Sequence, residues 1–144
     1  MPADDRALIG TWKLKSVVRE DAGAGERYDQ LGAHPDGYLS YSSDGRMYGI
    51  IVAGERIKPD AAAPSDAERA ALHKSMIAYA GTYTVEGNKV VHHIVTAWAP
   101  QRNGDDQVRY FEITGKNLII KTAPLKDVTT GRPAVPTLVF ERVE

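Results

Sequence analysis

Residues 81–98 read GTYTVEGNKVVHHIVTAW and carry the clearest structural signal in the chain. Two segments that suit β-strands flank Gly87-Asn88, a dipeptide that favours the tight turn of a two-residue hairpin loop. Residues that lie opposite each other in a hairpin share one face of the sheet, so this loop sets Tyr83 opposite His92. The segment therefore predicts a β-hairpin with a histidine and a tyrosine on one face.

Most of the remaining sequence follows the same design of short strands and tight turns. Apolar and polar residues alternate along these segments, and Gly, Asn or Asp residues separate them. Turns are predicted at Ser43-Asp44-Gly45 and at Gly115-Lys116. The predicted strands are residues 9–20, 27–31, 37–42, 46–52, 81–86, 89–98, 107–114, 117–122 and 137–142.

One segment has a different period. Ser65 and Glu68 have the spacing of a helix capping box, and apolar residues follow at helical intervals as far as Tyr79. We predict one inserted α-helix over about residues 66–78, ended by Gly81.

The order of these elements predicts the architecture. Eight or nine sequential antiparallel strands hide their edges by closing into an up-and-down β-barrel, whose interior has room for one small ligand. The helix would lie across one end or along the outer wall. An open two-sheet sandwich is the alternative. The length of the chain, 144 residues, fits a single all-β domain over residues 1–144.

Hairpin pairing also predicts which side chains face the interior. His92 and Trp98 share the face of Tyr83, whereas a three-residue loop would exchange His92 for His93. Both histidines therefore stay open as candidates at this point.

The other hairpins extend this inner face. A two-residue turn at Asp44-Gly45 sets Tyr41 opposite Tyr48, and the hairpin over residues 107–122 turns Arg109 inward. The predicted ligand-binding residues are Tyr41, Tyr48, Tyr83, His92, Trp98, Arg109 and Phe111.

A lining that is mostly apolar and has a few polar groups is typical of a ligand pocket. We expect it to bind a small hydrophobic molecule, with an aromatic body and an acidic head group as further options. Arg109 favours the acidic head group, because a buried guanidinium cannot lose its charge and needs an anion or a ring face beside it. No cofactor is expected.

An enzyme is the alternative function. A cofactor-independent isomerase, cyclase or dehydratase would use the same cavity to convert a small metabolite. His92 would be the acid or base, Tyr83 a proton donor, and Arg109 the group that stabilises an enolate-like charge. The sequence leaves binding and catalysis open.

Composition disfavours other classes of function. The 18 Lys and Arg residues are balanced by 19 Asp and Glu, which removes the electrostatic attraction that nucleic acids or anionic membranes require. No segment approaches the ~20 apolar residues of a membrane span, and no leader sequence is evident. The chain has no cysteine, so a cytoplasmic location is expected.

Two further expectations concern metals and partners. The histidines lack the spacing of a zinc site, because His92 and His93 are adjacent on a strand and point opposite ways. We therefore expect no metal. The outer residues Val91, Val95 and Ala97 form an apolar set that either the helix or a second copy of the chain would cover, which makes a homodimer one of two options.

Several motifs resemble a known family. Gly10-Thr11-Trp12 opens the first strand as the Gly-x-Trp of lipocalins does, and Arg142 ends the last strand where those barrels place an arginine over that tryptophan. Residues 37–41, 44–47, 80–83, 91–93 and 107–111 are similar, in this order, to the bacterial and fungal lipocalin-like domain family of calycin-type barrels.

The resemblance covers nearly the whole chain and implies a closed barrel with an interior cavity. It further implies that Trp12 and Arg142 form a structural plug that closes one end by cation–π stacking. It implies no particular reaction, because a fold hosts many functions.

Overall fold

We describe the fold from a computed structural model of the chain. The structure describes residues 5–21, 27–29, 34–54, 56, 58–59, 63–122, 125–126 and 133–143. The strands are β1 (Gly10–Asp21), β2 (Arg27–Asp29), β3 (Asp36–Tyr41), β4 (Arg46–Val52), β5 (Met76–Glu86), β6 (Lys89–Ala97), β7 (Asp106–Thr114), β8 (Asn117–Lys121), β9 (Leu125–Lys126) and β10 (Pro133–Arg142). The helices are α1 (Asp66–Lys74) and the 3₁₀ turns η1 (Asp5–Leu8) and η2 (Pro100–Arg102).

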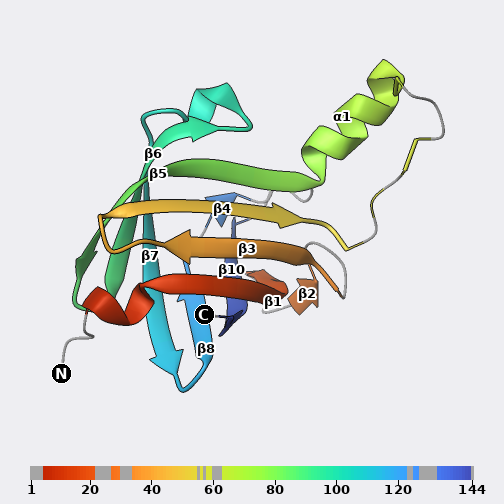
Figure 1. Ribbon diagram of the computed structural model, residues 1–144. Coiled ribbons are helices and arrows are strands. Elements are labelled where there is room, and N and C mark those ends of the chain that lie inside the picture. The colour runs from red at the N-terminus through yellow and green to blue at the C-terminus, as the bar shows by residue number, and fades with distance from the viewer. Residues whose placement is uncertain are drawn as a thin grey trace.

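Eight of these strands close into an antiparallel up-and-down barrel (Figure 1). Strands β3 to β8 pair in sequential order, β1 pairs with β3, β8 pairs with β10, and β1 with β10 completes the ring. The short strands β2 and β9 pair antiparallel with β1 and with β10, respectively. The predicted barrel is confirmed, and the sandwich is not formed. Residues 30 and 31, the end of the predicted second strand, lie outside the described residues.

Helix α1 begins where the sequence predicts and ends earlier. Ser65 caps it by accepting from the Glu68 backbone N–H at 3.2 Å, and the Glu68 carboxylate accepts from the Ser65 N–H at 2.9 Å. The helix stops at Lys74 because the next residues join the sheet, with Met76 paired to Val52 of β4. Sheet pairing here overrides helical periodicity.

The position of α1 differs from the prediction. No side chain of α1 is buried, and the helix projects away from the barrel beyond the start of β5 instead of covering an end or the wall (Figure 1). Arg56 ties its last turn down, donating to Leu72 O at 3.1 Å and to Ser75 Oγ at 2.9 Å. Among the described residues, no helix is long and apolar enough to cross a membrane.

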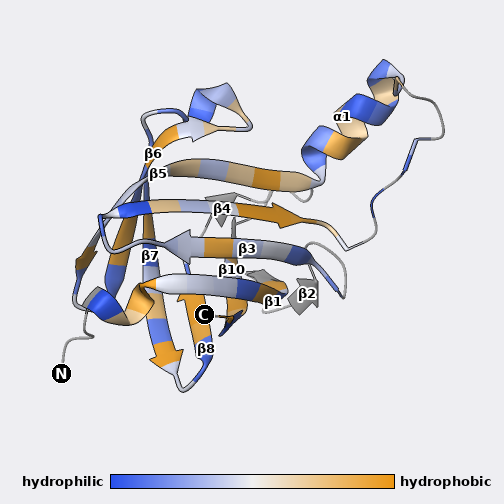
Figure 2. Ribbon diagram, viewed as in Figure 1, coloured by the Kyte–Doolittle hydropathy of each residue, from blue (hydrophilic) through white to orange (hydrophobic). Residues whose placement is uncertain are grey.

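The barrel interior is packed at the end where the chain enters β1. Apolar and polar residues alternate along the strands, as the bands on β7 show in Figure 2. Trp12 is fully buried, and its Nε1 donates to Leu8 O at 2.9 Å. The Arg142 guanidinium lies 4.1 Å from the Trp12 ring centroid and donates to Ala7 O and Ile9 O. The cation–π plug that the resemblance implies is therefore present.

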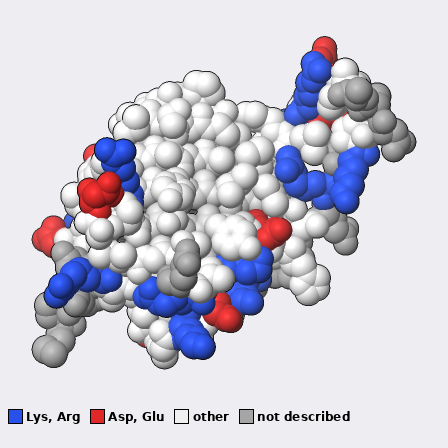
Figure 3. Space-filling view, viewed as in Figure 1, with Lys and Arg blue, Asp and Glu red and all other residues white. Residues whose placement is uncertain are grey.

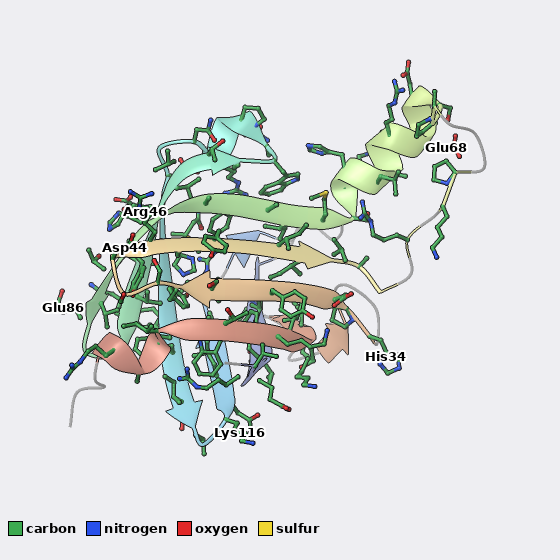
Figure 4. All side chains as sticks on the ribbon, viewed as in Figure 1. His34, Asp44, Arg46, Glu68, Glu86 and Lys116 are labelled. Carbon is green, nitrogen blue, oxygen red and sulfur yellow. The ribbon has the colours of Figure 1, made fainter. Side chains whose placement is uncertain are left out.

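The β3–β4 hairpin differs from its predicted register by one residue. Its loop has three residues, because the Ser42 N–H donates to Arg46 O at 2.9 Å, and Tyr41 pairs with Met47. The Asp44 carboxylate holds this loop by accepting from the Ser42 hydroxyl and from the Arg46 N–H (Figure 4). One extra loop residue turns every β4 side chain over. Tyr48 is therefore on the outer face, 57% exposed, and its predicted inward position is wrong.

The β5–β6 hairpin has the predicted two-residue loop, and the pairing of Tyr83 with His92 is confirmed. Further along, Val95 is an extra residue on β6, because Gly81 pairs with Ile94 and Ala80 with Thr96. This bulge reverses the alternation beyond it.

Ala97 therefore takes the inner side, opposite Tyr79, and the predicted inward position of Trp98 is wrong. Trp98 lies instead near His73 of α1, with ring centroids 6.2 Å apart. The expected outer set is divided as well, since Val95 is 66% exposed and Ala97 is on the inner side.

Candidate ligand-binding cavity

A cavity of about 130 Å³ lies inside the barrel. A cavity of about 150 Å³ is known to hold benzene, so this one fits a molecule of about one ring. Its walls are mainly aliphatic and aromatic side chains from β3, β4, β5, β8 and β10: Leu39, Ile51, Ile77, Ile120, Leu138 and Phe140. Its polar side chains are those of Tyr79, His92, Arg109 and Thr122.

His92 is the most enclosed polar group of this lining, only 3% exposed. Its Nε2 lies 2.5 Å from the Tyr41 hydroxyl oxygen, and its Nδ1 lies 2.7 Å from that of Tyr79. Burial, reinforced by the positive charge of Arg109, lowers the pKa of His92 to about 3. The imidazole is therefore neutral at neutral pH, and both of its nitrogens are engaged.

Tyr41 and Tyr83 lie in the packed interior and not on the cavity wall. Their rings meet edge to face with centroids 4.8 Å apart, and Tyr41 is 1% exposed. The Tyr83 hydroxyl donates to Ser42 O at 2.8 Å, at the turn between β3 and β4. Phe111 is likewise part of the core, at 5% exposed. Neither these tyrosines nor Phe111 line the cavity, which departs from the predicted lining.

Tyr79 is a cavity residue that the sequence interpretation missed. It lies on β5, two residues before Gly81, and its hydroxyl faces His92. Burial raises the pKa of the Tyr79 hydroxyl, and the neighbouring Arg109 guanidinium acts to lower it. Extending the alternation of β5 backwards from Tyr83 through Gly81 would have reached Tyr79, but the helical pattern hid this signal.

Arg109 enters the cavity from β7, as predicted, and is partly buried. Its Nη1 donates to its neighbour's carbonyl oxygen, Val108 O, at 3.2 Å. Within the described part of the chain, no Asp or Glu carboxylate lies at ion-pair distance from it. The cavity thus holds a cationic group with no anionic partner among the described residues.

The outer surface differs in character from the cavity. Figure 3 shows a broad uncharged area over β3, β4 and β5, with the charged side chains gathered at the margins and on α1. Tyr38, Tyr48 and Ile50 are exposed there. Among the described residues, no three His, Asp or Glu side chains come together as a metal site would require.

Comparison with known families agrees with this architecture. The family model described as a lipocalin-like domain matches residues 9–143, almost the entire chain. No curated protein matches the sequence. The matched region includes every barrel strand and every cavity residue named above, and the chain belongs to the lipocalin-like domain family.

Proposed function

We propose that this protein binds a small hydrophobic molecule in the barrel cavity, with an acidic head group beside Arg109. The observation that supports this proposal is an apolar cavity that holds one guanidinium and, among the described residues, no carboxylate to pair with it. Burying the apolar body of such a ligand contributes about 25 cal/mol per Å² of surface removed from water. The anion would supply the partner that a guanidinium requires in apolar surroundings.

Binding is favoured over the enzymatic alternative by the state of His92. An acid or base must accept or release a proton within reach of the substrate. Both nitrogens of His92 hydrogen-bond to tyrosines, and its pKa is lowered to about 3 by burial. Tyr83, the proposed proton donor, already donates to Ser42 O. The cytoplasmic location and the homodimer stay predictions.

Benzoate and toluene are suitable probes because they share a ring and differ in the head group. We expect both to bind the full chain by calorimetry or ligand-observed NMR. Leu138→Trp fills the cavity and should abolish both interactions. Val108→Trp introduces the same tryptophan side chain at a 40% exposed position on the outer face of β7 and should leave both unchanged.

Arg109→Leu tests the contact with the head group separately from the binding of the apolar ring. It should weaken benzoate binding about ten-fold or more, the equivalent of losing one hydrogen bond to a charged group, and should spare toluene. If neither probe binds, or if both bind Leu138→Trp as well as they bind the original chain, the cavity is not a ligand site.

A further inference from the structure

The hydrogen-bond chain Tyr41–His92–Tyr79 has a direction that can be worked out by counting protons. A neutral imidazole carries one N–H and one lone pair. A tyrosine hydroxyl lies against each nitrogen of His92, at Nε2 and at Nδ1. One of the two hydroxyls must therefore donate to the ring, and the other must accept from it.

Tyr41 fixes which hydroxyl is the donor. Tyr41 is 1% exposed, and within the described part of the chain the Nε2 atom of His92 is the one hydrogen-bond partner of its hydroxyl. A buried hydroxyl proton without an acceptor costs roughly 1 to 3 kcal/mol. Tyr41 therefore donates to Nε2, and the ring proton is on Nδ1, from which it is donated to the Tyr79 oxygen.

This direction leaves the proton of the Tyr79 hydroxyl without an acceptor in the described chain. Its oxygen receives the His92 N–H, and the neighbouring Arg109 guanidinium has donors only. Tyr79 lines the cavity, so we take its hydroxyl proton as the one that a ligand in this space would accept.

We propose that Tyr79 and Arg109 together form a two-donor site that selects a carboxylate head group, and that His92 and Tyr41 are positioning residues that aim the Tyr79 proton. The proposal rests on the proposed function, since it specifies the head group of the same ligand. A carboxylate accepts from both donors. A protonated amine offers donors and a positive charge beside Arg109, so it is excluded.

The opposite direction makes a different prediction about the protein without ligand. With the proton on Nε2, Tyr41 would keep a buried donor without an acceptor, and Tyr79 would donate to Nδ1. Tyr79 would then present only a lone pair to the cavity. The tautomer of His92 therefore reports the direction of the whole chain.

The tautomer can be measured without any ligand. We expect an NMR correlation spectrum of the imidazole nitrogens, recorded on isotopically labelled protein, to show His92 neutral and protonated on Nδ1. Protonation on Nε2 overturns the proposal. This measurement stands even if the cavity binds no probe, so failure of the proposed function and failure of the directed chain are distinguishable.

The selectivity is tested with Tyr79→Phe. We expect a loss of benzoate affinity of about ten-fold, as for one hydrogen bond to a charged acceptor, and no change for nitrobenzene, an uncharged molecule of the same shape. Benzylamine should not bind either form. Tyr83→Phe is the matched control, because it removes the same atom from the same strand where the hydroxyl meets Ser42 O, outside the cavity lining.

The control should keep the affinities of the original chain for both ring compounds. Equal benzoate affinity in Tyr79→Phe and Tyr83→Phe, or equal loss of benzoate and nitrobenzene in Tyr79→Phe, overturns the assignment of Tyr79.

Discussion

His92 and His93 are neighbours on β6 and lie in opposite environments. His92 is 3% exposed and meets two tyrosine hydroxyls inside the barrel. His93 faces outward, with its Nδ1 2.8 Å from the Asp106 carboxylate and its Nε2 3.1 Å from the Thr84 hydroxyl. The pleat of the strand separates them, and the loop length of one hairpin decides which is inside. Environment, and not residue type, therefore determines the chemistry of each histidine.

At neutral pH, the substitution with the largest expected effect is one that displaces the strand carrying both histidines. Gly81→Ala would place a Cβ 1.9 Å from His93 O, a backbone atom at the bulge, so β5 and β6 would have to separate. We expect a loss of stability on the order of 3 kcal/mol by urea denaturation.

Gly87→Ala is its control. That glycine has a φ of +61° and open space around it, so the substitution strains the turn without a clash. It should cost only about 1 kcal/mol. Equal losses in the two variants would show that the bulge is not closely packed.

Substituting each histidine in turn compares how much the two contribute to the free energy of unfolding. His92→Leu leaves the Tyr41 hydroxyl proton buried without its acceptor, and should lower the free energy of unfolding by about 2 kcal/mol. His93→Leu acts on the outer face and should stay within about 0.5 kcal/mol. Adding Tyr41→Phe to His92→Leu should restore part of the loss, since the stranded hydroxyl is then gone. An unchanged loss in the double variant would argue against the hydrogen bond.

The buried environment of His92 should also make the stability of the protein depend on pH. The pKa of His92 falls from 6.5 to about 3 on folding, so between these values the unfolded chain binds a proton that the native barrel does not. The contribution of neutral His92 to stability is complete above pH 6.5 and declines as the pH falls toward 3, by up to about 1.4 kcal/mol for each pH unit. His92→Gln should flatten this slope, measured by denaturation over that range.

The smallest effect is expected on the outer face. Tyr48→Thr replaces a side chain that is 57% exposed, and should change stability by less than about 0.5 kcal/mol. Benzoate affinity should be unchanged as well, because Tyr48 does not line the cavity. A weaker benzoate interaction in this variant would mean that β4 has the originally predicted register.

The sequence predicted the barrel and most of its strands because alternation and turn residues are local signals. The tight turn at Gly87-Asn88 determined the register of β5 and β6 correctly, and with it the inward position of His92. Assuming a two-residue turn between β3 and β4 misplaced Tyr48, because the Asp44 carboxylate stabilises a three-residue loop there. An additional residue of this kind leaves no mark on the alternation pattern.

Two other errors arose from contacts that no local pattern encodes. The bulge at Val95 displaced Trp98, and it lies where Gly81 comes close to the backbone of β6. Tyr79 was grouped with the helical pattern just beyond the predicted helix of residues 66–78, whereas residues 76–79 join β5 through pairing with β4. The position of Tyr79 in the cavity is thus determined by strand pairing and not by its local sequence.

The pairing of β1 with β10 has a consequence for how the molecule folds. Trp12 and Arg142 are paired although they lie near opposite ends of the sequence. Forming their contact therefore costs the entropy of closing a loop of almost the whole chain. Topologies of this kind have high contact order and fold slowly. We expect the neighbouring hairpins to assemble first and the ring to shut last, so that the hollow centre comes into existence only at the end of refolding.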